Sequence, residues 1–173
     1  MDGHEQHRAR VAQLRESFAA ATHRLLQRLR DTGNEGECAR DDRWSPAQIG
    51  WHVAAVTTRF AGIISGEVAG AQPVAQDFRE RPWAEIVPTI AARLRAPAIV
   101  QPPPDVTCSQ AIADLEAAET RMLAALDRLG PERASSYGIT SPIVGAINLY
   151  QVAEWATAHT IRHYRQAKLT LGR

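Results

Sequence analysis

Apolar residues recur at alternating steps of three and four along four long stretches of this 173-residue chain. This spacing puts them on one face of an α-helix, because the helix completes a turn every 3.6 residues. Valine, isoleucine and threonine are scattered between polar residues and nowhere alternate with them as in a half-buried strand. The pattern therefore predicts an all-α chain whose four long helices bury their apolar faces against one another.

Capping residues indicate where these helices begin. Ser45 and Gln48 stand three residues apart with Pro46 at the first helical position, which is typical of a capping box at a helix start. Thr107 and Gln110 repeat the same spacing, and a further box begins at residue 148. Glycines at positions 33, 66 and 130 provide stops. The expected long helices are residues 4–30, 45–65, 107–129 and 148–169.

The segment 66–106 contains seven of the ten prolines, so we expect it to be mostly extended, with one short helix around residues 83–95. Forty residues are enough to run the length of a bundle, which lets the third long helix lie beside the second in the same direction. The sequence thus predicts a four-helix bundle with up-down-down-up order and a long crossover between the second and third long helices. We expect residues 1–173 to form a single domain.

Charge and composition exclude several classes of function. The chain has 20 Lys and Arg residues against 19 Asp and Glu residues, so no strong field is present to attract nucleic acid or an anionic membrane. No apolar run approaches the roughly 18 residues of a membrane span, and the first residues lack the apolar core of a signal peptide. Only Cys38 and Cys108 are present, too few for a disulfide framework. We therefore expect a soluble, cytoplasmic protein with reduced thiols.

Three histidines occupy positions where an apolar side chain is expected. His52 lies on the apolar face of the second long helix, and His159 and His163 lie one turn apart on that of the fourth. Burying an imidazole without a partner costs about 1–3 kcal/mol, so these side chains need compensation. Ordinary hydrogen bonds in the core would supply it for any one of them. Their shared placement favours a single metal ion with three nitrogen ligands and open coordination positions.

Other residues are candidates for a part in such a site. Glu119 falls on the apolar face of the third long helix, where it would hold a ligand in place or act as a catalytic base, or else lie at the surface. Gln166 follows His163 by one turn. Its amide would hydrogen-bond to a metal-ligating histidine, a cofactor or a substrate, or else it would simply cap the core. Trp44 or Trp83 would wall a pocket near one end of the bundle.

The order and spacing of these residues resemble the DinB/YfiT-like superfamily of four-helix metalloproteins. The resemblance covers residues 45–166 and is carried by Trp44, Ser45, Pro46, Ile49 and His52 in one helix and by His159, His163 and Gln166 in the last. It implies a metal ion held by the three histidines, and metal-dependent transfer or hydrolysis. It further implies homodimers and, as in several members, transferase or isomerase chemistry with a low-molecular-weight thiol such as mycothiol or bacillithiol.

The functional prediction is a metal-dependent enzyme that acts on small molecules, either as a thiol-dependent S-transferase or isomerase or as a hydrolase. Imidazole ligands suit zinc or nickel, with iron or manganese as alternatives. The alternative function is a noncatalytic, stress-related protein that binds a small ligand or a metal. A catalytic centre needs an open coordination position, whereas a storage site is closed by a fourth protein ligand.

Overall fold

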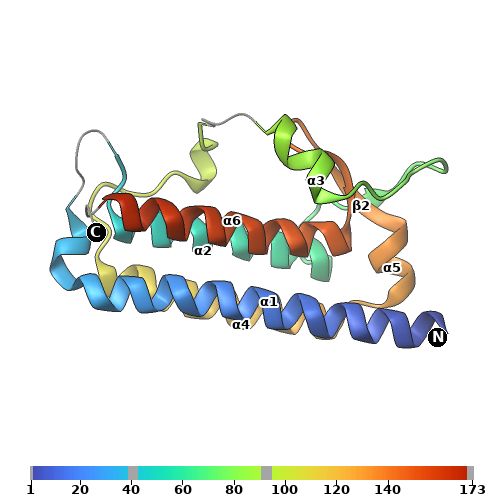
Figure 1. Ribbon diagram of the computed structural model, residues 1–173, viewed down its shortest axis with the longest axis horizontal. Helices are drawn as coiled ribbons and strands as arrows, with labels where there is room; N and C mark the ends of the chain where they lie inside the picture. The colour runs from blue at the N-terminus through green and yellow to red at the C-terminus, as the bar shows by residue number, and fades with distance from the viewer. Residues whose placement is uncertain (1, 39–42, 91–94, 171–173) are drawn as a thin grey trace.

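Four long helices lie side by side and make up most of the protein (Figure 1). The structure is a computed structural model that describes residues 2–38, 43–90 and 95–170. The long helices are close to the four predicted ones, and the first extends two residues further than expected. They are α1 (Gly3–Thr32), α2 (Pro46–Ser65), α4 (Cys108–Asp127) and α6 (Leu149–Thr170).

Of the three predicted capping boxes only the first is complete: Thr107 and Asn148 accept from the nitrogens of Gln110 and Gln151, but neither glutamine side chain bonds back to the cap. The Ser45 hydroxyl accepts a hydrogen bond from the Gln48 amide nitrogen, and the Gln48 side chain accepts one from the Ser45 nitrogen, so this capping box is complete. Thr107 caps α4 by accepting from the Gln110 nitrogen, but the Gln110 side chain bonds to Asp114 and not to the cap. The second box is therefore half formed, since the nearby carboxylate competes for the amide.

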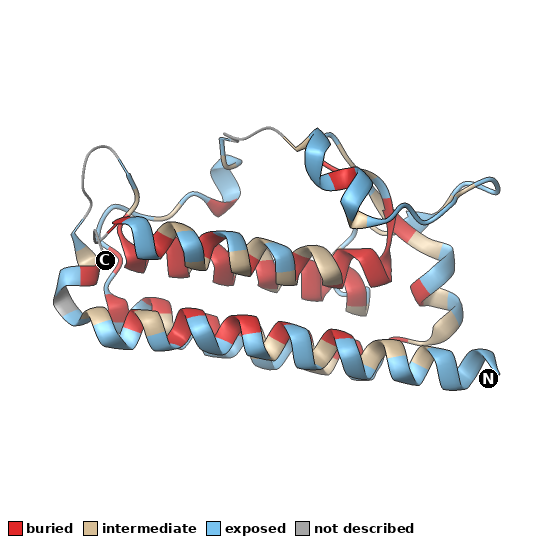
Figure 2. Cartoon of the chain, viewed as in Figure 1, coloured by how far each residue is buried: buried red, intermediate tan, exposed pale blue. Residues whose placement is uncertain are grey.

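The apolar faces of the helices meet in an interior that contains two groups of buried side chains. In Figure 1 the chain runs in one direction along α1 and α6 and in the opposite direction along α2 and α4. Buried residues are concentrated on the faces that the helices turn toward one another (Figure 2). One group of buried side chains centres on Phe18 and Met122, and a second, toward the other end, on Leu29 and Leu115.

The expectation of a purely α-helical chain is wrong in one region. Three short strands form an antiparallel sheet in the order β1 (Gln72–Pro73), β2 (Tyr137–Ser141) and β3 (Gly145–Asn148). A Cβ atom at Gly138 would lie 2.0 Å from the Ile147 carbonyl oxygen, so the pairing of β2 with β3 requires glycine there. These strands are too short for a period of two to stand out in the sequence.

The crossover also differs from the prediction. The helix expected around residues 83–95 is reduced to α3 (Trp83–Ile86) and a 3₁₀ turn, η2 (Val87–Thr89), while residues 91–94 lie outside the described part of the chain. Pro88 lacks an amide proton and stops the α-helix there. Three unpredicted short elements complete the fold: η1 (Gly33–Glu37), η3 (Ala98–Val100) and α5 (Pro131–Ser136). The turn η3 brings the crossover alongside α2.

Candidate metal centre

The three histidines singled out in the sequence come together between α2 and α6. Each of His52, His159 and His163 offers one ring nitrogen, and these three atoms lie within 4.8 Å of one another. His52 and His163 are only 5% and 9% exposed, whereas His159 is partly exposed. The cluster therefore lies at the edge of the core.

Packing between α2 and α6 sets the register that brings the rings together. His159 and His163 lie one turn apart on α6, with ring centres separated by 4.3 Å. Two turns beyond His52, the ring of Phe60 packs at 5.0 Å against Trp155, which lies one turn before His159. Because the two helices run in opposite directions, this aromatic contact holds His52 opposite the histidine pair.

Hydrogen bonds fix which nitrogen of two rings is available to a metal ion. Nδ1 of His52 lies 2.7 Å from the Val100 carbonyl oxygen, which can only accept, so Nδ1 carries the proton and Nε2 has a free lone pair. In the same way Nδ1 of His163 donates to Oε1 of Gln166 over 2.8 Å, which leaves its Nε2 available. The Val100 carbonyl and the Gln166 side chain thus each stabilise the tautomer that is protonated at Nδ1. This tautomer leaves Nε2 free to bind a metal ion.

The distances between nitrogens also fit a metal ion. Nε2 of His52 and Nε2 of His159 are 3.2 Å apart. Two nitrogens bound at about 2.0–2.1 Å to one tetrahedral ion are separated by about 3.3 Å. Nδ1 of His159 is buried and has no hydrogen-bond partner within the described residues.

All three imidazoles are uncharged at neutral pH. Burial lowers the pKa of His52, although its hydrogen bond to the Val100 carbonyl partly opposes this effect. Burial holds the pKa of His159 well below its ordinary value, and repulsion from Arg162 and from His163 and His52, when these are protonated, acts in the same direction. For His163, burial and the proximity of His52 lower the pKa to about 4. Neutral imidazole is the form that binds metal ions.

The comparison with protein families identifies the superfamily of the chain. The family model of the DinB superfamily matches residues 4–167. The chain belongs to the DinB superfamily. No curated protein matches it. Among the described residues of this DinB-superfamily chain, no helix is long and apolar enough to cross a bilayer.

The two additional candidates, Gln166 and Glu119, have different positions in this DinB-superfamily chain. Gln166 lies at the cluster, where its side-chain oxygen accepts a hydrogen bond from His163 Nδ1. The carboxylate of Glu119 lies 3.2 Å from Nε2 of His23 on α1, and its contacts in the described chain do not include the three histidines. Burial raises the pKa of Glu119.

The tryptophans also separate into two groups. Trp44 lies against the cluster, with its ring centre 4.9 Å from that of His52, so it shields one side of that imidazole. Trp83 instead donates a hydrogen bond to Glu154, which joins α3 to α6.

The carbonyl of Val100 is a functional group that the sequence analysis missed, because a backbone oxygen leaves no signal in the sequence.

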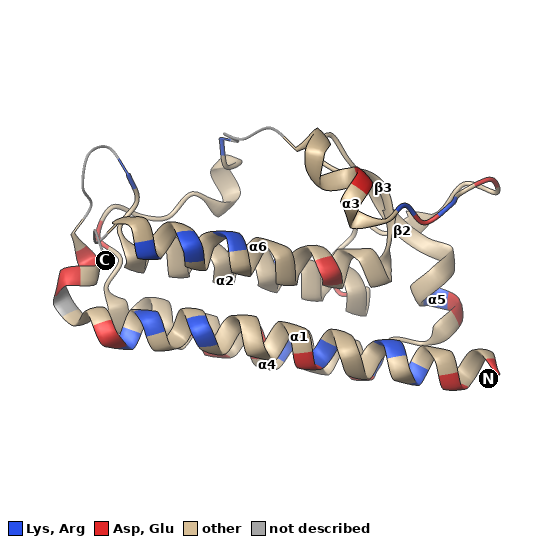
Figure 3. Cartoon of the chain, in the orientation of Figure 1, with Lys and Arg blue, Asp and Glu red and all other residues tan. Residues whose placement is uncertain are grey.

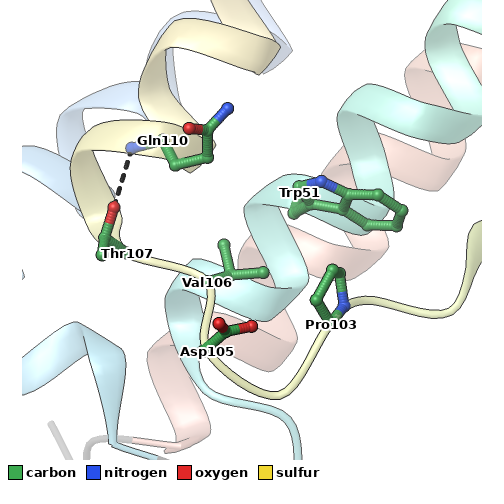
Figure 4. Close-up of a pocket in the computed structure, with 6 residues that line it drawn as sticks. All are labelled: Trp51, Pro103, Asp105, Val106, Thr107 and Gln110. Atoms are coloured by element: carbon green, nitrogen blue, oxygen red, sulfur yellow. Dashed lines mark hydrogen bonds between the residues drawn. The ribbon is translucent and has the colours of Figure 1, made fainter.

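A surface hollow of about 300 Å³ lies beside α2, where the crossover leads into α4 (Figure 4). The ring of Trp51 faces that of Pro103 across it, and Asp105 and the Thr107 cap lie at its other side. Of the described residues that line this hollow, none belongs to the histidine cluster. The hollow and the cluster are therefore separate features of α2.

Proposed function

We propose that the chain is a metal-dependent enzyme acting on small molecules. Residues 1–173 would form its single domain, with the four long helices in up-down-down-up order. His52, His159 and His163 would hold a divalent ion, with zinc or nickel favoured over iron or manganese. One observation carries the proposal: three neutral imidazoles from two helices offer nitrogens within 4.8 Å of one another. Within the described ranges, no cysteine, carboxylate or further histidine joins this group.

Three protein ligands leave coordination positions open, as in catalytic rather than structural sites. An ion held by neutral nitrogens keeps most of its charge, and it would lower the pKa of a coordinated thiol or water toward neutrality. The protein's own residues serve this chemistry in two ways. Val100 and Gln166 keep the lone pairs of His52 and His163 directed at the ion, and Trp44 excludes water from one side of His52. We assign no catalytic part to Glu119, which contacts His23.

The family resemblance supports thiol-dependent transfer or isomerisation, with mycothiol or bacillithiol as the thiol. Hydrolysis is the other reaction open to such a site.

A second candidate function is that of a noncatalytic protein that stores a metal or a small ligand. The low exposure of His52 and His163 favours it, because a buried site exchanges its contents slowly. Homodimerisation and a cytoplasmic location remain predictions.

Metal analysis of protein purified without a histidine tag tests the centre. We expect about one equivalent of metal in the wild type and none in His159→Ala or His163→Ala. His4→Ala is the matched control, because His4 is an exposed histidine in the first turns of α1. Equal metal content in all four proteins would show that the ion binds elsewhere.

An activity screen separates the two candidate functions. Metal-loaded protein is incubated with an electrophile and mycothiol, bacillithiol or glutathione, and separately with ester and amide substrates. Metal-dependent turnover that His163→Ala abolishes would support the enzyme. A stoichiometric ion without turnover of any substrate would favour the storage protein. Sedimentation of the same samples measures whether the chain is a dimer.

A further inference from the structure

The hollow between α2 and the start of α4 is open to solvent and has an aromatic wall (Figure 4). Its volume is about 300 Å³, at the lower end of the roughly 300–1,000 Å³ that small-molecule sites occupy. Pro103 and Asp105 are exposed and Trp51 is partly exposed, so a molecule in solution reaches all three. The lining residues are Trp51, Pro103, Asp105, Val106, Thr107 and Gln110. The hollow therefore has room for one small organic molecule.

The polar side chains on the α4 side of the hollow present hydrogen-bond acceptors. The side-chain nitrogen of Gln110 donates to both carboxylate oxygens of Asp114, so its oxygen is the atom that has no partner among the described residues. The Thr107 hydroxyl is held between the backbone nitrogen of Gln110 and the Ser109 hydroxyl. Asp105 makes no hydrogen bond or ion pair within the described part of the chain. A ligand with a positive charge and hydrogen-bond donors complements these groups.

The start of α4 does not make the hollow a site for an anion. The backbone nitrogen of Cys108 already donates to the Glu37 carboxylate over 2.8 Å, and that of Gln110 donates to the Thr107 hydroxyl. Glu37 belongs to η1, which also carries Glu35, at the end of the bundle where α1 ends and α4 begins (Figure 3). Among the described residues that line the hollow, none is a lysine, arginine or histidine. The carboxylates therefore offset the positive end of the helix dipole, and the hollow favours a cation.

Trp51 determines which kind of cation fits. The ring of Trp51 faces that of Pro103 across the hollow, with the Asp105 carboxylate at the other side (Figure 4). The face of an indole ring attracts a cation more strongly than that of any other side chain, and ammonium groups of ligands are recognised in this way. A calcium ion needs six to eight oxygen ligands, whereas this lining holds a single carboxylate. An organic ammonium group matches both the ring and the charge.

We propose that the hollow binds the ammonium group of a small organic amine, with Trp51 against the cation and Asp105 as its counter-ion. The site is distinct from the histidine cluster. Trp51 directly precedes His52, and successive side chains on a helix diverge by about 100°, so the two sites use adjacent faces of α2. The assignment depends neither on the metal nor on the proposed enzymatic function.

Binding of choline and of ethanolamine tests the site. Each is titrated into the full chain at constant pH and ionic strength, with chelator present, and the indole N–H signal of Trp51 is followed by NMR. We expect saturable binding of at least one amine and at least fivefold weaker binding by Asp105→Asn. The amine that saturates identifies the group as a quaternary or a primary ammonium. Asp77→Asn is the matched control, because it removes the same charge from an exposed position of the crossover outside the hollow.

Two further measurements separate recognition of the cation from apolar binding. Dimethylbutanol and propanol have the shapes of choline and ethanolamine without the charge, so we expect them to bind at least fivefold more weakly. Trp51→Phe keeps an aromatic face and should bind the amine more tightly than Trp51→Leu does. Without amine, Asp105→Asn should unfold at the same temperature as the wild type, because Asp105 is exposed and has no partner in the described chain.

Three results would overturn the proposal. Neither amine saturates the Trp51 signal, the uncharged alcohol binds as tightly as its amine, or Asp77→Asn loses as much affinity as Asp105→Asn. The second result would mean that the hollow is merely apolar, and the third that the amines are attracted by the net charge of the protein. The comparison of Asp105→Asn with Asp77→Asn decides the matter even where Trp51→Leu does not fold, because both aspartates are exposed.

Discussion

Replacing His159 with leucine should separate the metal function of the cluster from its structural function. Nδ1 of His159 is buried and has no hydrogen-bond partner within the described chain, an arrangement that costs about 1–3 kcal/mol. His159→Leu removes this nitrogen. It also removes the 3.2 Å contact to Nε2 of His52 and leaves that atom unsatisfied at a similar cost. The two effects nearly cancel, so the free energy of unfolding of metal-free protein should change by no more than about 1 kcal/mol.

The assay is urea unfolding followed by circular dichroism, once with a chelator and once with excess zinc. A ligand at a hundred times its dissociation constant stabilises the folded state by about 2.7 kcal/mol. We expect the wild type and the control His4→Leu to show a gain of this size. We expect His159→Leu to show none, because two imidazoles are then left to hold the ion.

Two results would refute this reasoning. A loss of more than about 3 kcal/mol in chelator would mean that His159 is a well-satisfied part of the core, since breaking a satisfied buried pair has that cost. An undiminished gain with zinc would mean that the ion binds away from the cluster. The sequence alone does not predict a near-zero change in chelator, because the prediction depends on the unpartnered nitrogen.

Three other predictions follow from the same contacts. Gln166→Ala removes the acceptor of the hydrogen bond from His163 Nδ1. We expect it to weaken zinc binding about 10–100-fold in a chelator competition. Unchanged zinc affinity would show that this hydrogen bond does not orient His163. Metal-free protein should lose stability as the pH falls from about 6.5 to about 4, because the lowered pKa of His163 makes the unfolded chain bind more protons in that window; urea midpoints that stay level there would contradict it. Gly138→Ala should destabilise the protein by about 2 kcal/mol or more, because the new Cβ meets the Ile147 carbonyl oxygen at 2.0 Å. Thermal unfolding measures this loss, and Gly3→Ala, with open space around it, is the control.

The helices could be predicted from the sequence because their determinants are local. The box formed by Ser45 and Gln48 and the left-handed Gly66 each act within one turn, and both appear as predicted. The sheet could not be predicted, because it joins residues 72–73 to residues 137–148 through strands of two to five residues. Pairing of this kind depends on long-range contacts, and only Gly138, where no side chain fits, carries any trace of it.

The site shows the same division between local and long-range information. A helical pattern identifies the face that a residue occupies, and this was sufficient to select the three histidines. It does not identify which neighbouring helix that face meets. Glu119 lies on α4, which packs against both α1 and α2, and its side chain meets His23 of α1 and not the histidines of α2 and α6. The pattern is therefore equally compatible with a catalytic position and with the pair between Glu119 and His23 that the structure contains.

The crossover fixes the tautomer of His52. An extended segment has no hydrogen-bond ladder of its own, so its backbone groups must find partners elsewhere. At one end, Arg10 joins Glu80 of the crossover to Glu154 of α6, and Trp83 donates to the same Glu154. At the other end, the Val100 carbonyl accepts a hydrogen bond from His52 Nδ1. Since that bond sets the tautomer, a change in the crossover can alter metal affinity without touching any of the three histidines.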